Sequence, residues 1–337
     1  MKLLVVILCY KVPELTIECL RSLASEIGRV PGTKVAVCEN GTGGDVPEQL
    51  RRAIEENGWS SWAELTVVYP NQGFCGGNNL VIRPALASAD PPEYVLLLNA
   101  DTVVQPHALD ALVDFMDAHP RAAIAGSQLH WPDGTIQCSP FRFPGVISEL
   151  DRGLNLGLFS KRVERWGIVV PTPKHDAPAE WVSGASMILR RSFLEQQGLL
   201  DEGLYTYFDD VDICMRAHRA GWESWYVTTS HIVHYEGSST GIKPTVQKRR
   251  PAYWFQARRR FFLKNYGALR TLFIDGAYLI GASLRRVRYA IQRKPESDPP
   301  DFLYDSFRHS VFFTGFRIRP VENPALAGVE AKRGPVR

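Results

Sequence analysis

Several familiar signatures are missing from this 337-residue sequence, and each absence argues against a class of protein. The six cysteines include no CxxC pair, so no zinc-ligand spacing is present. No run of about 20 apolar residues occurs, which argues against a helix that spans a bilayer. No GxGxxG or GxxxxGK(S/T) motif follows a predicted strand, so the NAD-binding and P-loop fingerprints are both missing.

The cysteines and the N-terminus favour a reducing, cytoplasmic setting. Several cysteines lie in apolar runs, where a free thiol behaves as a small hydrophobic side chain. The N-terminal MKLLVVILCYK could belong to a signal peptide, but its apolar run is short, and Leu8 rather than a small residue precedes Cys9. We therefore expect residues 3–9 to form a buried strand.

Positive charge is concentrated in one segment. Thirteen Lys and Arg residues but a single acid, Asp275, lie between residues 248 and 294, whereas the rest of the chain has 26 basic and 35 acidic residues. The segment also contains Trp, Tyr, Phe and Leu, a mixture typical of an amphipathic helix that lies on anionic lipid. A solvated helical pair or a homodimer contact is the alternative. Nucleic-acid binding has no helix-turn-helix or stacking motif in its support.

Short apolar runs alternate with amphipathic segments in the first hundred residues, which predicts an α/β fold. The runs are apolar throughout, as in strands of a mostly parallel sheet covered on both faces. Ligands bind beyond the carboxyl ends of such strands, so the turns that follow them are candidate sites. Strands are expected at residues 3–9, 34–38, 65–69 and 94–98, and helices at residues 13–25, 47–56 and 78–89.

The second part of the chain is less regular. Residues 130–180 are rich in Pro and Gly and are expected to be loop-like. Basic, aromatic helices are expected from about residue 245, and the last forty residues are expected to form an extended tail. The other predicted elements are a helix at 107–118, a strand at 122–127, a strand entering a helix in WVSGASMILRR, and a strand at 224–227.

Two turns in the first half offer nucleotide-binding groups. In PNQGFCGGNN, Gly73, Gly76 and Gly77 allow close approach of the backbone, and a helix beginning near Asn78 directs amide donors at a diphosphate. In CENGTGGD, Glu39 can accept hydrogen bonds from a base or a ribose. Ordinary turn formation is the alternative for both stretches.

The stretch LLLNADTVV brings Asn99 and Asp101 to the end of a buried strand. Oxygen ligands at this point could hold Mg²⁺ or Mn²⁺ on the phosphates of a substrate. His234, in SHIVHYEGSS, could supply a further ligand as a neutral imidazole. The alternatives are structural, because Asp101 could organise the turn before Pro106 and a lone histidine is usually part of the scaffold.

Three aspartates lie close together in YTYFDDVDICMRAHRAGW. A helix beginning near Asp210 would have Asp209 as its N-cap and would pair Asp212 with Arg216 on the wetter face. Asp210 alone would face inward, and partial burial raises the pKa of a carboxyl while a helix N-terminus favours its ionised form. Such a group is a credible general base at neutral pH. The inward stripe would consist of Asp210, Ile213, Cys214 and Ala217.

These motifs, in this order, resemble the inverting family 2 glycosyltransferases with the GT-A fold, and within them the bacterial rhamnosyltransferase-like members. The resemblance runs from about residue 4 to residue 239. It implies that Asp210 is the catalytic base and that Asp101 and His234 hold Mg²⁺ or Mn²⁺. It assigns the nucleotide-sugar to Glu39, Asn71, Gly73, Phe74, Gly77, Asn78, Asn99 and Asp101. It assigns the sugar and acceptor pocket to Trp181, Ser183, Gly184, Ala185 and Asp209.

The sequence departs from the family pattern at three positions. Asn99 stands in place of the first aspartate of the metal-binding triplet, which weakens direct metal binding and is common in the rhamnosyl-type branch. Lys11 stands where asparagine is common after the first strand, and Asp209 replaces a glutamate.

The resemblance also implies a domain plan and a function. Residues 1–244 would form the catalytic domain, with a nucleotide-binding half (1–105) and an acceptor half (106–244), followed by a basic helical segment (245–294) and a tail (295–337). The enzyme would move L-rhamnose from dTDP-L-rhamnose to a glycan or polyprenyl-diphosphate-linked saccharide, in cell-envelope polysaccharide synthesis at the inner face of the cytoplasmic membrane.

Three alternatives stay open beside this function. A UDP-sugar (GlcNAc, Gal or galactofuranose) could be the donor for a different acceptor, or the chain could be a non-catalytic module that binds a sugar nucleotide. A sugar-phosphate nucleotidyltransferase would share the fold, but it should have a GGxGTR loop after the first strand, where this chain has YKVPEL.

Overall fold

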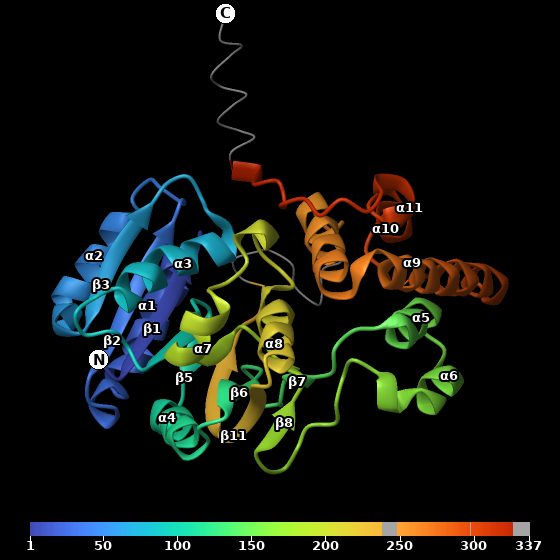
Figure 1. Ribbon diagram of the computed structural model, residues 1–337. Helices are drawn as coiled ribbons and strands as arrows, with labels where there is room; N and C mark the ends of the chain where they lie inside the picture. Colours follow the sequence, from blue (N-terminus) through green and yellow to red (C-terminus); the bar gives the residue numbers. More distant parts are fainter. Residues whose placement is uncertain (238–247, 297, 326–337) are drawn as a thin grey trace, which may run out of the picture.

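The computed structural model describes residues 1–237, 248–296 and 298–325. A nine-stranded mixed sheet forms the centre of the molecule, and helices cover its two faces (Figure 1). Its strands are ordered β3-β2-β1-β4-β10-β6-β11-β5, with β8 paired to β11 outside this path. The predicted α/β class is therefore correct.

The first half of the sheet is parallel, as its apolar runs predict. Strands β1 and β4 are buried almost throughout, because helices pack on both faces of the sheet. The elements are β1 (Leu3–Cys9), α1 (Pro13–Ala24), β2 (Thr33–Asn40), α2 (Val46–Glu56), β3 (Ala63–Val68), α3 (Gly73–Leu86) and β4 (Tyr94–Asn99). The predicted strand at residues 65–69 is present, but as β3 it lies at the sheet edge and is partly exposed.

The second half of the sheet contains both strand directions. β10 lies antiparallel between β4 and β6, and β11 runs parallel to β6. β11 also pairs antiparallel with β5, which brings the two chain segments around Asp101 and His234 together. The elements here are β5 (Thr102–Val104), α4 (Ala108–Ala118), β6 (Ala122–His130), β9 (Trp181–Val182), β10 (Ser186–Arg190), α7 (Arg191–Gln197), α8 (Asp209–Arg219) and β11 (Glu223–His234).

Two predicted boundaries are wrong. Helix α3 begins at Gly73 rather than near Asn78, so the glycine-rich stretch forms the first turn of the helix itself. The region 130–180 is not simply loop-like, because it contains two helices and short strands. These are β7 (Pro140–Phe141), α5 (Val146–Leu154), α6 (Gly157–Arg162) and β8 (Ala177–Ala179).

The basic segment forms α9 (Ala252–Gln292), which changes direction at Gly267, where φ is 74° and ψ is 176°. Helix α5 crosses its second half closely, since a Cβ atom on Gly153 would lie 2.6 Å from the backbone oxygen of Tyr278. The predicted extended tail is wrong for residues 302–314, because α10 (Phe302–Arg308) and α11 (Val311–Thr314) form there and pack on α9. The predicted boundary at residues 244 and 245 lies outside the described residues.

The basic side chains in the first half of α9 do not form a basic surface. Arg258 is buried and binds Asp275 at 2.6 Å and Glu149, on α5, at 2.7 Å. Arg259 donates to the backbone oxygens of Gly315 and Arg317. The predicted amphipathic helix on anionic lipid is therefore wrong for this half of the segment. Among the helices that the structure describes, none is long and apolar enough to cross a membrane.

Candidate active site

A cleft of about 780 Å³ opens at the carboxyl ends of β1 and β4, where ligands bind in sheets of this kind. Its walls come from both halves of the sheet, from the loop before α8 and from the start of α9. The cleft brings together eleven of the residues predicted from the sequence. They are Asn71, Gly73, Phe74, Asn99, Asp101, Ser183, Gly184, Ala185, Asp209, Asp210 and His234.

Sheet register brings the two predicted metal ligands together. β5 begins directly after Asp101, and its pairing with β11 sets His234 opposite Thr102. The Nε2 atom of His234 consequently lies 3.5 Å from Oδ1 of Asp101, and both side chains are buried. Asn99 Nδ2 lies 3.4 Å from the same imidazole nitrogen.

Gln137 determines which nitrogen of His234 carries the proton. Its Nε2 donates to the backbone oxygen of His234 at 2.7 Å, so its Oε1 is the atom 3.2 Å from the imidazole Nδ1. An amide oxygen can only accept, so Nδ1 of a neutral ring donates and Nε2 keeps its lone pair. This lone pair and the Asp101 carboxylate face each other, an arrangement that suits a cation between them.

The residues present therefore fit a divalent cation, although they supply only part of its coordination. Within the described ranges, no group of three or more His, Cys, Asp or Glu side chains is arranged as a metal cage. Mg²⁺ and Mn²⁺ commonly bind through one or two protein ligands together with substrate phosphates and water. Asp101 and His234 would hold the ion in this way.

The turn before α3 is fixed by amide side chains. Asn40 donates from Nδ2 to the backbone oxygen of Gly73 at 3.0 Å and accepts from the Gln72 amide at 3.0 Å. Asn71 accepts from the Gly73 amide at 2.7 Å and from the Tyr205 hydroxyl at 3.2 Å. Gly73 has φ of 73°, and a Cβ atom there would lie 2.4 Å from the Tyr205 ring. Only glycine fits this position.

Two carboxylates of α8 line the cleft. The Asp210 carboxylate accepts from the backbone amides of Val211, at 2.8 Å, and Gly184, at 3.4 Å. Burial raises the pKa of Asp210, and burial together with the adjacent Asp210 charge raises the pKa of Asp209. The positive end of α8 favours the ionised form and opposes both shifts. Burial therefore raises the pKa of both carboxyls, and that of Asp209 reaches about 8.

Asp209 and Asp212 do not have the roles that helical spacing predicts. Phe208 occupies the N-cap position of α8 with φ of 61°, and Asp209 is already helical, so Asp209 is not the cap. The pair of Asp212 and Arg216 exists at 3.3 Å, but Asp212 is 1% exposed rather than on a wet face. Sequence spacing within one helix cannot show that α9 covers that side.

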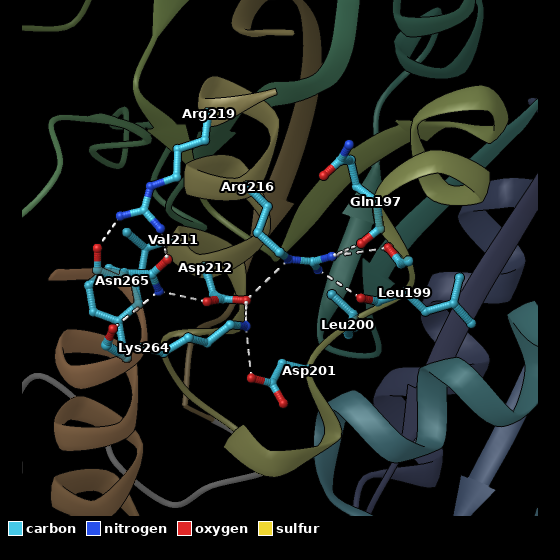
Figure 2. A network of polar contacts seen from close by, with 12 residues as sticks. Gln197, Leu199, Leu200, Asp201, Val211, Asp212, Arg216, Arg219, Lys264 and Asn265 are labelled. Atoms are coloured by element: carbon cyan, nitrogen blue, oxygen red, sulfur yellow. Dashed lines mark hydrogen bonds and ion pairs between the residues drawn. The ribbon is translucent and has the colours of Figure 1, made fainter. Parts of the chain in front are cut away.

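Asp212 is buried because α9 supplies partners for it. Lys264 lies 2.8 Å from Asp212 and 2.8 Å from Asp201, and Asn265 donates to Asp212 at 2.8 Å (Figure 2). Burial would raise the pKa of Asp201, but hydrogen bonds from Arg260 and Lys264 lower it to about 2. Polar contacts therefore hold the helix that carries Asp210 against α9.

Four predicted residues lie outside the lining of the cleft. The Glu39 carboxylate accepts from the Thr42 amide at 2.6 Å, the turn role that was its alternative. A Cβ atom on Gly77 would lie 2.5 Å from Leu8, so this glycine permits close packing of α3 on β1. Asn78 donates within α3 to Phe74, and Trp181 stacks on Phe141. A direct contact of these four with substrate stays a prediction.

Other lining residues were not predicted. Asn40 was interpreted only as a turn residue, and Tyr205 and Tyr207 only as neighbours of the aspartates. Arg250 and Tyr253 line the cleft from the start of the basic segment, where interleaved Arg and Tyr could have been considered for a diphosphate. Gln137 gave no signal, because its contact with His234 depends on two distant segments meeting.

Resemblances to solved structures define the class of the fold. The Staphylococcus aureus TarS 1–349 complex with UDP-GlcNAc has a TM-score of 0.55 at 14% identity, covering 92% of this chain and 82% of the TarS 1–349 chain. A mannosyltransferase of Pyrobaculum calidifontis, in complex with GDP-Man and Mn²⁺, has a TM-score of 0.52 at 14% identity, covering 100% of this chain and 88% of its own. The chain has the GT-A glycosyltransferase fold, as its motifs predict.

The sequence comparison narrows this class to a family. Residues 2–262 match the family described as "Glycosyltransferase like family 2", and the chain belongs to this family. It is 30% identical over 211 residues to the N-acetylglucosaminyl-diphospho-decaprenol L-rhamnosyltransferase of Mycobacterium tuberculosis, covering 58% of this chain and 66% of that protein. It is 25% identical over 167 residues to rhamnosyltransferase WbbL of Escherichia coli, covering 48% of this chain and 61% of WbbL. The matches thus span just under two thirds of these relatives.

Proposed function

We propose that this chain is an inverting glycosyltransferase that transfers L-rhamnose from dTDP-L-rhamnose to a polyprenyl-diphosphate-linked saccharide. The observation that carries the proposal is a single cleft with the Asp101 and His234 pair on one wall and Asp210 on another. Family membership supports the reaction class. The printed names of the M. tuberculosis and E. coli relatives support the rhamnosyl donor, and the former supports the lipid-linked acceptor.

The proposed reaction is one in-line displacement. The Asp210 carboxylate takes the proton of an acceptor hydroxyl, whose oxygen forms a bond to C1 of the sugar. The bond from C1 to the diphosphate oxygen breaks on the opposite face, and the nucleoside diphosphate leaves with the electron pair. A divalent cation on Asp101 and His234 would supply positive charge to the leaving diphosphate. One displacement inverts C1, so a β-linked donor gives an α-rhamnoside.

The other site residues have binding and positioning roles in this proposal. The Gly73 turn, fixed by Asn40 and Asn71, would hold the donor, with Glu39 on the side of the nucleoside. Ser183, Gly184 and Ala185 would line the sugar and acceptor pocket beside Asp209. The reaction would take place at the inner face of the cytoplasmic membrane, where a polyprenyl-linked acceptor is available.

A donor screen tests the proposal. Melting temperature is measured with dTDP-, UDP- and GDP-sugars in the presence of Mn²⁺, and transfer is then measured with a diphosphate-linked GlcNAc acceptor. We expect dTDP-L-rhamnose to stabilise the protein most, because a ligand that binds only the folded state raises its stability. Stabilisation by a UDP-sugar alone would overturn the donor assignment. Binding without transfer or donor hydrolysis would identify a non-catalytic module.

A further inference from the structure

An unusual number of large apolar side chains is exposed in the C-terminal part of the molecule. Six of them lie on the second half of α9, where Ile291 is 78% and Leu269 is 69% exposed. Four more follow within and after α11. We call these ten side chains the apolar surface: Leu269, Phe273, Ile280, Leu284, Val287, Ile291, Phe312, Phe313, Phe316 and Ile318.

The six side chains on α9 form one stripe along the helix. Successive members are separated by four, seven, four, three and four residues, spacings that keep them on one face of an α-helix. The opposite face is the packed one, because Ile274, Tyr278 and Ala282 are buried there. A Cβ atom on Gly281 would also lie 2.8 Å from a backbone oxygen of α5. The stripe is therefore separate from the packing of α9 against the rest of the molecule.

The residues from α11 onward continue this surface. A Cβ atom on Gly276 would lie 3.6 Å from the Phe312 ring, so α11 adjoins α9 between Phe273 and Ile280. Arg259 binds the backbone oxygens of Gly315 and Arg317 at 2.9 and 2.7 Å, which fixes the segment that carries Phe316 and Ile318. Figure 1 shows the second half of α9 extending away from the sheet, with α10 and α11 beside it.

Positive charge predominates along the apolar surface, although Glu296, Asp298 and Asp301 lie in the hollow that Arg285 and Arg286 also line. Exposed Arg side chains lie on and just beyond residues 268–292, at Arg270, Arg286 and Arg293. After α11, exposed Arg and apolar side chains alternate from Phe316 to Arg319. The one acid within residues 268–292 is Asp275, which is buried and bound to Arg258. Exposed apolar side chains bordered by Arg are the pattern of a helix that lies in a membrane interface. Anionic headgroups would complement the Arg side chains.

We propose that the apolar surface docks the protein onto an anionic lipid bilayer, with the second half of α9 lying in the plane of the interface. A second copy of the chain is a less suitable occupant, because packing two stripes together would oppose Arg side chains of like charge. The inference deepens the proposed function and rests on it in one respect, since a lipid-linked acceptor would be presented at this interface. The surface itself is independent of the donor and of the chemistry.

Vesicle flotation of the full chain tests this inference. The probes are vesicles of phosphatidylcholine alone and of phosphatidylcholine mixed with phosphatidylglycerol. The test variant is Ile280→Glu/Leu284→Glu, and the matched control is Val67→Glu/Ile136→Glu, which adds the same charge to exposed apolar residues on the sheet side of the molecule. We expect binding to the mixed vesicles, little binding to phosphatidylcholine, and a loss of about 100-fold or more in the test variant only.

Two further readouts separate the possible failures. Transfer to a water-soluble acceptor should be unchanged in Ile280→Glu/Leu284→Glu. If the wild-type chain binds the vesicles but transfers no sugar, the proposed function is contradicted and the docking surface is retained. Transfer without binding of the wild-type chain to anionic vesicles would overturn the docking surface. Sedimentation velocity identifies the competing occupant, since a wild-type dimer that the test variant converts to monomers would assign the apolar surface to a second copy.

Discussion

Asp209 and Asp210 are adjacent carboxylates, but their roles in the proposed reaction differ. Asp210 accepts amide hydrogen bonds from Val211 and Gly184, whereas burial and the charge of Asp210 raise the pKa of Asp209 to about 8. A base must be ionised to accept a proton, so activity should fall as the pH falls through the pKa of the pair. Asp210 ionises first, and its charge then raises the pKa of Asp209.

The change Asp209→Asn should leave the acidic limb of the pH profile of kcat/KM close to its wild-type position, because Asp209 is still protonated and uncharged at the pH where Asp210 ionises. The stability of the variant gives a second readout. A carboxyl whose folded pKa is raised contributes stability below its ordinary pKa of 3.8 and loses it as the pH rises toward 8. Asp209→Asn should consequently melt at a higher temperature than wild type at pH 8 but not at pH 4. A large shift of the acidic limb toward lower pH would show that Asp209 is already charged when Asp210 ionises, and would contradict this order.

Gln137 should control metal affinity through His234. Its replacement in Gln137→Met removes the acceptor that holds the proton on Nδ1 of His234. Loss of such a partner commonly weakens metal binding about 10- to 100-fold. We expect that loss in Mn²⁺ affinity, measured by electron paramagnetic resonance with the nucleoside diphosphate bound. The control is Gln49→Met, at a residue of α2 that lies away from the cleft. Equal Mn²⁺ affinities in the two variants would contradict the role of Gln137 in orienting His234.

Single residues were predictable from the sequence where their role depends on local spacing. The carboxyl-end position of Asp101 follows from the apolar strand before it. Helical periodicity correctly turned Asp210 toward the cleft but wrongly set it apart as the one inward-facing aspartate, because Asp209 and Asp212 are buried more fully than Asp210. Asn40 and Gln137 were not predictable, because their partners are set by the pairing of distant segments. Asp212 was misplaced for the same reason, since Lys264 and Asn265 come from another helix.

Helices α8 and α9 are joined by polar rather than apolar contacts at the position of Asp212. Breaking a buried ion pair from one side leaves an uncompensated charge, which is strongly destabilising. Lys264→Met should lower the free energy of unfolding by about 2 kcal/mol, because Arg216 and Asn265 still contact Asp212. Urea denaturation measures the change. The control is Arg83→Met, which breaks an exposed pair with Glu202 and should lower the free energy of unfolding by at most about 1 kcal/mol. An equal loss in both variants would contradict the account.

Elements with strong apolar periodicity were predicted well, and elements stabilised in other ways were missed. β1, β4 and α1 have continuous or helical apolar patterns and lie where expected. α5 was missed because it packs through a Gly153–Gly281 contact and a Glu149–Arg258 pair, neither of which gives a periodic apolar signal. α3 begins early because Asn40 and Tyr205, both distant in sequence, fix its first turn.

In the molecule as a whole, the basic segment neutralises part of the acidic body. Arg258, Arg260 and Lys264 bind Glu149, Asp201, Asp212 and Asp275 internally. The charge asymmetry of the sequence was therefore correctly recognised, but it could not indicate which basic residues are buried. The second half of α9 and the residues after α11 combine exposed Arg with exposed apolar side chains.

The central claim is that Asp210 is the base of a glycosyl transfer, and Asp210→Asn tests it most directly. The amide keeps the size of the side chain but accepts a proton poorly, so the transfer rate should fall by about 10²- to 10⁴-fold. The Kd for the nucleotide-sugar should stay close to wild type, and the melting temperature should not fall, because the amide replaces a carboxyl whose pKa is raised by burial. Asp114→Asn, an exposed residue of α4, is the control and should retain full transfer. Full transfer by Asp210→Asn would contradict the account.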